Sequence, residues 1–483
     1  MFETMKGRQK YISLSVGILA WFMGGIVFAF NAYAIALKQT FNYTQTELDY
    51  VASSGDLAIA VAFPAGLVLD NFGPRVTCTV SLILTTLGFA LMWMATQFKI
   101  FFTTKSWLLS VFYFLTSGGI RFIIVATKVV ICKNFKRKHM GKILGLYSTI
   151  YGISPAIFSA IYEGLFVQGH IEDAENQKLS EFLIMLALLS FCINLYAAIL
   201  LKMESEGMDD PKEAELASTK QNGDETKDAT AEGHDNDPVG TKKEVNDKTE
   251  LISKKTDRLP QPEMTCWQII KTIQFYYLII ISLIVAGVGG SFTNNITTVV
   301  KSARLEEYAI IFTVVIPICS SFGRFFGGMI PDFIFQKWPD IPKSSILLFP
   351  GICSCVGHVS FSISDQSLGG LIFSSMIMAL AYGSFYTQNN IIAIQLFGLK
   401  YYGQNSGLIA IGRGIGILTF QKLFAFFYET NSQLGSKYCY GERCYRWYFL
   451  LMAIICLCVV FLIFCLMKIE RDQRLQHEEE KAS

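Results

Sequence analysis

Two arginines lie inside long apolar stretches of the sequence. Arg121 follows a glycine pair in Ser117-Gly-Gly-Ile-Arg121, and Arg413 lies between Gly412 and Gly414. A guanidinium keeps its charge when buried, and it binds a carboxylate or phosphate through two parallel hydrogen bonds. Both arginines are therefore candidate binding residues for an anionic solute. The alternative for each is a structural pairing with a carboxylate or with carbonyls at a helix end.

Two further ionisable residues lie in such stretches. Asp56 is a carboxyl group inside an apolar run, where it can take up and release a proton and so serve in proton coupling. Its alternative role is a structural ion pair with a buried arginine. Lys128 lies near the end of its run, and we expect its long side chain to reach the membrane surface.

Amide and phenol side chains occur on other apolar stretches, several of them close to glycines. A few fixed polar groups in a mostly apolar pocket are typical of a small-molecule site. Hydrogen bonding between neighbouring helices is the alternative for these side chains. The candidate lining residues are Asn31, Tyr33, Asn294, Asn295, Tyr386 and Asn390.

The elements that must position these residues are membrane-spanning helices. The chain has 483 residues, of which 52% are hydrophobic and 17% are charged, whereas soluble domains carry roughly 25% charged residues. A span needs about 20 apolar residues to cross the hydrocarbon core. We predict an all-α polytopic membrane protein with twelve spans, at about 11–36, 48–69, 75–96, 107–132, 141–166, 180–202, 268–300, 306–330, 344–362, 368–397, 405–428 and 446–468.

A single hydrophilic block divides the spans into two groups of six. Residues 203–263 hold 17 of the 39 acidic and 9 of the 41 basic residues, and they lack the apolar runs that could offset ordering entropy. We predict an N-terminal six-helix bundle (1–202), a disordered acidic linker (203–263), a C-terminal six-helix bundle (264–468) and a tail (469–483).

Basic residues in the connections predict the orientation. They occur before the first span, after the fourth and after the twelfth, which are all on one face if the spans number twelve. Both termini and the linker are therefore expected to be cytoplasmic. The basic residues concerned are Lys6, Arg8, Lys10, Lys133, Lys136, Arg137, Lys138, Lys142, Lys468, Arg471 and Arg474.

A glycine–aspartate pattern recurs at equivalent places in the two groups of spans. After the second span it reads Gly66-Leu-Val-Leu-Asp70-Asn-Phe-Gly73-Pro-Arg75, and after the eighth it runs from Gly323-Arg324 through Gly328 to Asp332. Glycine lets two helices approach closely, and a carboxylate can meet a helix N-terminus or a facing arginine. These residues are candidates for a gate.

Six-plus-six spans with this loop resemble the major facilitator superfamily of secondary transporters, and within it the nodulin-like, monocarboxylate-transporter-like branch. The resemblance implies alternating access to a central site, lined mostly by the first and fourth helices of each half. It also implies that Asp70, with Arg75, latches a cytoplasmic gate; the second copy lacks the later Gly-x-Arg. The stretches that carry the resemblance are 41–48, 66–75, 141–147, 154–158, 289–295, 396–403 and 439–447.

Other chemistry has little support in the sequence. Cys439 and Cys444 lie in the last external loop, where a disulfide is expected and a metal site is not, because no histidine is near. No phosphate-binding Gly-x-x-x-x-Gly-Lys loop and no nucleophile motif is present, so we expect neither an enzyme nor a cofactor. Nucleic-acid binding is not expected.

The function predicted from the sequence is secondary transport of a small organic solute, a carboxylate-bearing anion, with proton coupling or exchange. The alternatives are a neutral or cationic solute, such as an amino acid or vitamin, and a non-transporting membrane sensor or scaffold. The expected partners are the solute, protons and the lipid bilayer, with the chain as a monomer. The expected location is the plasma membrane or an endomembrane such as the vacuole or lysosome.

Overall fold

The computed structural model describes residues 2–135, 139–167, 177–203, 263–364, 367–432 and 439–482. Met1–Met203 and Pro262–Ser483 form one compact unit. The predicted linker lies outside the described residues except for its first and last positions, 203 and 263. Three of the expected cytoplasmic basic residues, 136–138, also lie outside them.

The first half of the unit contains the first six spans. The first span consists of α1 (Phe2–Gly24), the 3₁₀ turn η1 (Gly25–Ala29) and α2 (Phe30–Phe41). The second begins with α3 (Gln45–Leu57) and η2 (Ala58–Val61) and continues into α4 (Ala62–Gln97). The other elements are α5 (Lys99–Phe102), α6 (Ser106–Asn134), α7 (Met140–Ile161), the π turn η4 (Tyr162–Phe166) and α8 (Leu179–Leu200).

The second half repeats this plan. A short helix, α11 (Cys266–Ile269), precedes its first span, α12 (Ile273–Ser302). The remaining elements are η6 (Glu306–Tyr308), α13 (Ala309–Lys337), η7 (Lys343–Leu347), α14 (Leu348–Ser362), α15 (Leu368–Phe397), α16 (Tyr402–Thr430), η8 (Glu442–Cys444) and α17 (Arg446–Ala482). The residues predicted as a tail after 468 continue α17 as helix.

The predicted fold class is confirmed, because eleven helices among the described residues are long and apolar enough to cross a membrane. One of them, Thr46–Gln97, has 52 residues and contains both the second and the third predicted span. The break between those spans is at Gly73, whose φ of 81° and ψ of 176° are not helical. Glycine adopts a positive φ without steric cost, and Pro74 then restarts the helix with its fixed φ.

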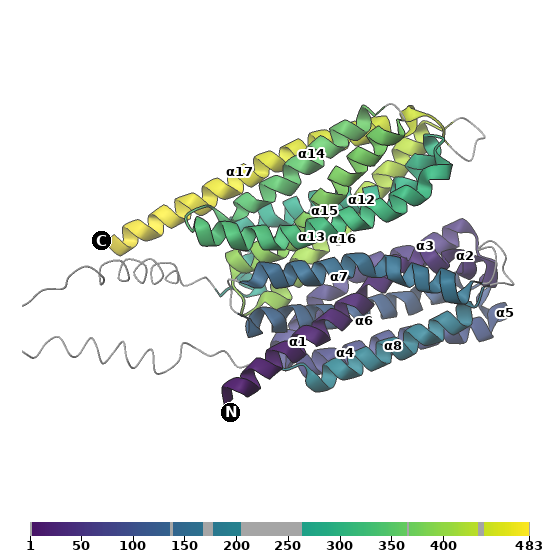
Figure 1. Cartoon of the computed structure of the whole chain (residues 1–483), viewed down its shortest axis with the longest axis horizontal. Helices are drawn as coiled ribbons and strands as arrows, with labels where there is room; N and C mark the ends of the chain where they lie inside the picture. Colours follow the sequence, from purple (N-terminus) through teal and green to yellow (C-terminus); the bar gives the residue numbers. More distant parts are fainter. Residues whose placement is uncertain are drawn as a thin grey trace, which may run out of the picture. The chain divides into compact units, whose positions relative to one another are not determined.

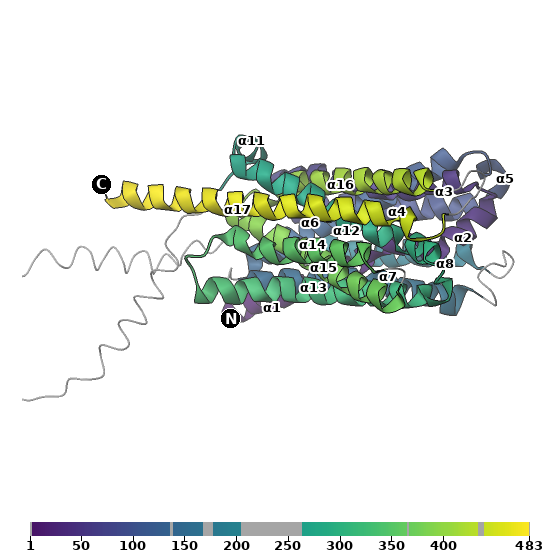
Figure 2. The same cartoon turned by 90° about the horizontal axis from the view of Figure 1, so that it is seen from above.

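Both chain ends of the unit lie at the same end of the bundle, as Figure 1 shows. We call this the terminal end: α1 begins there and α17 ends there. In Figure 2, α17 continues beyond the neighbouring helices toward the C-terminus. The opposite end contains the Cys439–Cys444 loop, and we call it the disulfide end.

Small residues allow close helix packing inside each half. The hydroxyl of Ser81 on α4 donates to the carbonyl of Gly119 on α6 at 2.7 Å, and Gly88 on α4 faces Thr116 on α6 with no room for a Cβ. Because lipid is as apolar as leucine, such contacts rather than hydrophobic burial hold membrane helices together. The α4–α6 pair thereby fixes the position of the candidate arginine on α6.

Candidate functional site

The two halves meet at the terminal end through Asp70. This carboxylate, on α4, accepts a hydrogen bond from the backbone N–H of Gln404 at 3.0 Å. Gln404 is the third residue of α16, where N–H groups have no partner inside the helix. One turn earlier on α4, Gly66 lies against the backbone of Gly403 with no room for a Cβ. Asp70 therefore acts as a cap for a helix of the opposite half.

Asp332 makes the equivalent contact in the opposite direction. Its two carboxylate oxygens accept from the backbone N–H groups of Gly141 at 3.0 Å and Lys142 at 2.9 Å, in the first turn of α7. Gly328, one turn earlier on α13, lies against the carbonyl of Gly141. A negative charge at a helix N-terminus is stabilised by the helix dipole. The recurring glycine–aspartate pattern thus forms two cross-half caps.

The helices that receive these caps share a pattern that our sequence reasoning missed. Both begin with Gly-x-x-x-Gly, as Gly141 and Gly145 on α7 and as Gly403 and Gly407 on α16. A Cβ added at Gly145 would lie 2.9 Å from the carbonyl oxygen of Phe325. The matching spacing at equivalent places in both halves was the available signal for a close contact between helices.

The two predicted gate arginines differ in position. Arg75 is exposed, and no hydrogen bond or ion pair of its side chain to Asp70 occurs within the described ranges, so Asp70 contacts a helix terminus rather than this arginine. Arg324 is buried, and its Nη1 donates to the carbonyl of Ser148 on α7 at 3.1 Å. Arg324 therefore lies between the halves and closer to the centre than the gate aspartates.

A small cavity of about 30 Å³ lies between the halves at the centre of the unit. A volume of this size holds about one water molecule. Both candidate arginines line it, together with Tyr386 and Asn390, so the structure brings together four of the predicted binding residues. Its polar and charged lining residues are Arg121, Lys128, Tyr386, Asn390, Ser406 and Arg413; Trp21 and Ile59 are among the apolar ones.

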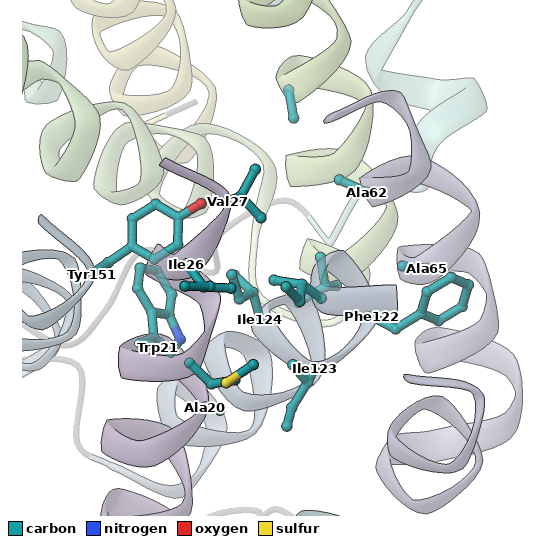
Figure 3. Close-up of a cluster of buried hydrophobic side chains, with 14 of the residues drawn as sticks. Ala20, Trp21, Ile26, Val27, Ala62, Ala65, Phe122, Ile123, Ile124 and Tyr151 are labelled. Atoms are coloured by element: carbon teal, nitrogen blue, oxygen red, sulfur yellow. The ribbon is translucent and has the colours of Figure 1, made fainter. Parts of the chain in front are cut away.

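Arg121 is buried in this lining and only partly satisfied. Its Nη1 donates to the hydroxyl of Tyr151 at 3.0 Å, while its Nε has no hydrogen-bond partner. The ring of Tyr151 also contacts Trp21 on α1, with 5.6 Å between centroids at an interplanar angle of 71°. Figure 3 shows the rings of Tyr151 and Trp21 next to each other, with Ile124 nearby. Tyr151, packed against Trp21, thus holds the guanidinium of Arg121 in place, and the Nε–H of Arg121 remains free to donate.

Two further guanidinium groups surround Tyr386 on α15. Those of Arg324 and Arg413 lie 4.8 Å and 5.2 Å from its ring centroid, within cation–π range. The Tyr386 ring stacks on that of Tyr151 with 6.0 Å between centroids. The Nε of Arg324 and one Nη of Arg413 are buried without a hydrogen-bond partner.

Lys128 does not reach the membrane surface, so the expectation for this residue is wrong. Its side chain is 5% exposed, and its Nζ donates to the Ser406 hydroxyl at 3.1 Å and the Asn390 amide oxygen at 3.5 Å. The reason is its position on α6: the side chain points to the opposite half, where polar acceptors lie closer than the headgroups. Lys128 thus joins the central cavity.

Asp56 on α3 is the acidic group that acts on this cluster of cations. It interacts electrostatically with Arg121, but within the described part of the chain no ion pair of 4.0 Å or less joins it to a basic side chain. The structural ion pair that we considered is therefore not formed in this state.

Three predicted lining residues lie away from the central cavity. Tyr33 is fully buried inside the first half, between Phe30 and Phe182. Asn294 is exposed and donates to Gln421 at 3.4 Å. Asn295 donates to the carbonyl of Ser291 on its own helix at 2.8 Å. The side chain of Asn31, a fourth candidate, lies outside the described residues.

A disulfide joins Cys439 and Cys444 at the disulfide end. It closes the turn that leads from α16 to α17, and the backbone N–H of Cys439 donates to the hydroxyl of Tyr428 at 3.0 Å. Among the residues that the structure describes, no group of three or more His, Cys, Asp or Glu side chains could hold a metal ion.

Comparison with known proteins shows what this architecture resembles. A sequence model of the family described as Major Facilitator Superfamily matches residues 14–421. A curated relative, the probable transporter mch1 of Neurospora crassa, is 22% identical, and the alignment covers 92% of this chain and 86% of that protein.

Solved structures show the same fold at low sequence identity. The proton:xylose symporter XylE has a TM-score of 0.62 at 9% identity, covering 95% of this chain and 96% of the symporter. The human organic anion transporter MFSD10 (TETRAN) has a TM-score of 0.59 at 11% identity, covering 94% of this chain and 99% of that transporter.

Proposed function

Because this chain belongs to the major facilitator superfamily, we propose that its alternating-access cycle carries a small organic anion with a carboxylate group. The observation that supports the proposal is the excess of positive charge at the centre of the unit. Three cations from both halves line the cavity, Arg121, Lys128 and Arg413. Arg324 lies beside it, 4.8 Å from the ring centroid of Tyr386, and Asp56 is an acidic group that interacts electrostatically with Arg121.

The free donors of the arginines favour an anionic solute. Leaving one buried charge without its partner costs about 3–5 kcal/mol, and three guanidinium nitrogens at this centre lack hydrogen bonds. A carboxylate bound between Arg121 and Arg413 would accept from two of them. A neutral or cationic solute would leave this charge uncompensated, and it is the less favoured alternative.

The cavity is too small for an organic solute in this state. With room for about one water molecule, it must enlarge before a carboxylate can enter. The halves are joined at the terminal end by the two aspartate caps, and Lys128 bonds across the halves beside the cavity. We therefore assign this structure to a state closed at the terminal end, and access from that end requires these contacts to separate.

Asp56 provides a route for proton coupling. In its ionised form it attracts Arg121 and competes with the solute carboxylate for this guanidinium. Once protonated, it no longer competes, so proton uptake at Asp56 and anion binding at Arg121 favour each other. This arrangement supports symport of one proton with the anion.

The test is counterflow of labelled lactate, succinate and a neutral amino acid in proteoliposomes that contain the purified full chain. We expect the wild type to exchange an anion, and Arg121→Gln to reduce its apparent affinity by about 10- to 100-fold, since a hydrogen bond to a charged group contributes about 1.5–3 kcal/mol.

The matched control is Arg443→Gln, the same substitution at an exposed position in the disulfide-end loop, which should leave counterflow unchanged. Unaltered rate and affinity in Arg121→Gln, or exchange of the neutral solute alone, would contradict the anion proposal.

A further inference from the structure

A second hollow lies far from the centre, at the terminal end of the second half. This groove of about 830 Å³ runs between the connection from α13 to η7 and the C-terminal half of α17. Its lining comes from Lys337–Pro342 on one side and from Phe464–Leu475 on the other. Figure 2 shows α17 extending past its neighbours in this region.

The groove is strongly basic. Lys337, Lys468, Arg471 and Arg474 line it, and Asp340 is the acidic residue of the lining. Arg474 approaches Asp340 at 3.9 Å, but the Asp340 side chain is fully exposed, so this pair is weak. Among the described residues, no ion pair engages Lys468 or Arg471. Most of the positive charge is therefore available to a ligand.

Two contacts hold the walls of the groove together. The Glu470 carboxylate on α17 accepts from the backbone N–H groups of Lys343 at 2.7 Å and Ser344 at 3.2 Å, at the start of η7. The Nη1 of Arg474 donates to the carbonyl of Asp340 at 2.6 Å. These bonds hold the connection against α17. The basic side chains therefore line a groove with two fixed walls and do not lie on a free helical tail.

The remaining lining is apolar and aromatic. Phe464, Met467 and Ile341 contribute to the groove, and Trp338 is 47% exposed beside Lys337, whose Nζ lies 4.7 Å from its ring centroid. Exposed tryptophan next to cations is typical of the membrane–water interface. The groove thus has an apolar part next to a positively charged part. This arrangement is complementary to a lipid, in which an acyl chain is joined to a negatively charged headgroup.

The level of the groove in the membrane agrees with this chemistry. A helix crosses the hydrocarbon core in about 20 residues at 1.5 Å per residue. Counted from Arg446, where α17 begins, the core ends near position 466. Phe464 and Met467 then lie at the edge of the acyl chains, and Lys468 and Arg471 lie among the headgroups.

We propose that this groove binds an anionic phospholipid of the surrounding bilayer, with its phosphate groups at Lys468 and Arg471 and an acyl chain along Phe464 and Met467. The predicted orientation places the site in the cytoplasmic leaflet, where anionic lipids are concentrated. A basic residue that only sets topology needs no hollow, and Lys202 and Lys271, exposed at the same end, do not line this groove.

The test measures lipid binding to the purified full chain by native mass spectrometry in detergent. Phosphatidylinositol 4-phosphate is titrated against phosphatidylcholine with the same acyl chains. We expect the wild type to retain the anionic lipid preferentially. Lys468→Gln with Arg471→Gln should weaken its binding about 30-fold, since each cation near an anionic membrane surface contributes about fivefold.

Two further variants keep the result interpretable. Lys202→Gln with Lys271→Gln removes the same charge from the same end and should leave lipid binding unchanged. Lys468→Arg with Arg471→Lys keeps the charge and should bind as the wild type does. Equal retention of phosphatidylcholine, equal loss in the Lys202/Lys271 variant, or equally tight binding of soluble inositol 1,4-bisphosphate would each overturn the membrane-lipid site.

Discussion

Residues at the centre of the unit combine charge with incomplete hydrogen bonding. Arg121 donates to Tyr151 and keeps its Nε free, while Tyr386 lies within cation–π range of both Arg324 and Arg413. The aromatic faces stabilise these cations without using up their donors. Buried guanidinium groups with unpaired N–H donors are expected in an empty anion-binding site. In a structural salt bridge, by contrast, the carboxylate partner already accepts these hydrogen bonds.

A residue-scale prediction concerns Asp56. In the wild type, anion uptake should rise as the external pH falls, because protonation of Asp56 frees Arg121 for the solute. Asp56→Asn mimics the protonated form, so its anion exchange should persist and lose its dependence on pH. The measurement is initial uptake and counterflow between pH 5.5 and pH 8 in proteoliposomes. A wild-type pH profile retained in Asp56→Asn would show that another group carries the proton.

At the scale of elements, the first two spans each contain a stretch of 3₁₀ helix. The first span changes to 3₁₀ geometry at η1 and the second at η2, and Ile59 of η2 lines the cavity. A 3₁₀ stretch inside a helix often marks a hinge. At the terminal end, Gly73 interrupts α4 and lets the chain turn directly into the third span.

Gly73 allows a clean test of backbone strain. A Cβ at this position would meet nothing within 4 Å, yet φ is 81°. Gly73→Ala should therefore lower stability only through its backbone conformation, which is essentially restricted to glycine, by about 1–3 kcal/mol. The measurement is the thermal unfolding midpoint in detergent. Gly369→Ala is the matched control, because that glycine also has open space around it and an ordinary helical φ, and its midpoint should not fall.

For the whole molecule, the two aspartate caps are equivalent contacts, one made by each half on a helix of the other half. Asp70 caps α16 from the first half, and Asp332 caps α7 from the second. The glycines beside them allow backbone contact at both places. Each cap joins the two halves at the terminal end, so in the proposed cycle each favours the state that is closed there.

The whole-molecule prediction concerns this balance of states. Asp70→Asn and Asp332→Asn each remove a charge–dipole interaction of about 0.3–1 kcal/mol. Together they should shift the population toward the terminal-open state by about 3- to 30-fold, since the two sites are distant and their effects add. Electron–electron resonance distances between spin labels at positions 202 and 271, on opposite halves, report the shift.

Asp472→Asn is the control for that experiment, because Asp472 is exposed on α17 and, among the described residues, no hydrogen bond or ion pair joins it to the first half. Its distance distribution should match that of the wild type. If the double variant also matches the wild type, the caps do not set the balance between the two states.

The sequence alone determined the fold class, and it pointed to the two glycine–aspartate positions, whose role as a gate stays a prediction. About 20 apolar residues are needed to cross a bilayer, so the spans can be counted from composition, and the recurring glycine–aspartate pattern identifies equivalent places in two halves. It also pointed to Arg121, Arg413, Tyr386 and Asn390, which line the central cavity. Polar side chains are rare in apolar spans, so these residues are conspicuous in the sequence.

Only the tertiary structure decided which side chains meet. These helices are apolar on most faces, so their sequence does not specify their rotation or their neighbours. For this reason Lys128 was expected at the surface and lies at the centre, and Tyr33, Asn294 and Asn295 lie elsewhere. The contacts that join Asp70 to Gln404 and Lys128 to Ser406 span more than 270 residues of chain. Such contacts depend on how the two halves pack against each other, and the sequence near each residue does not specify its partner.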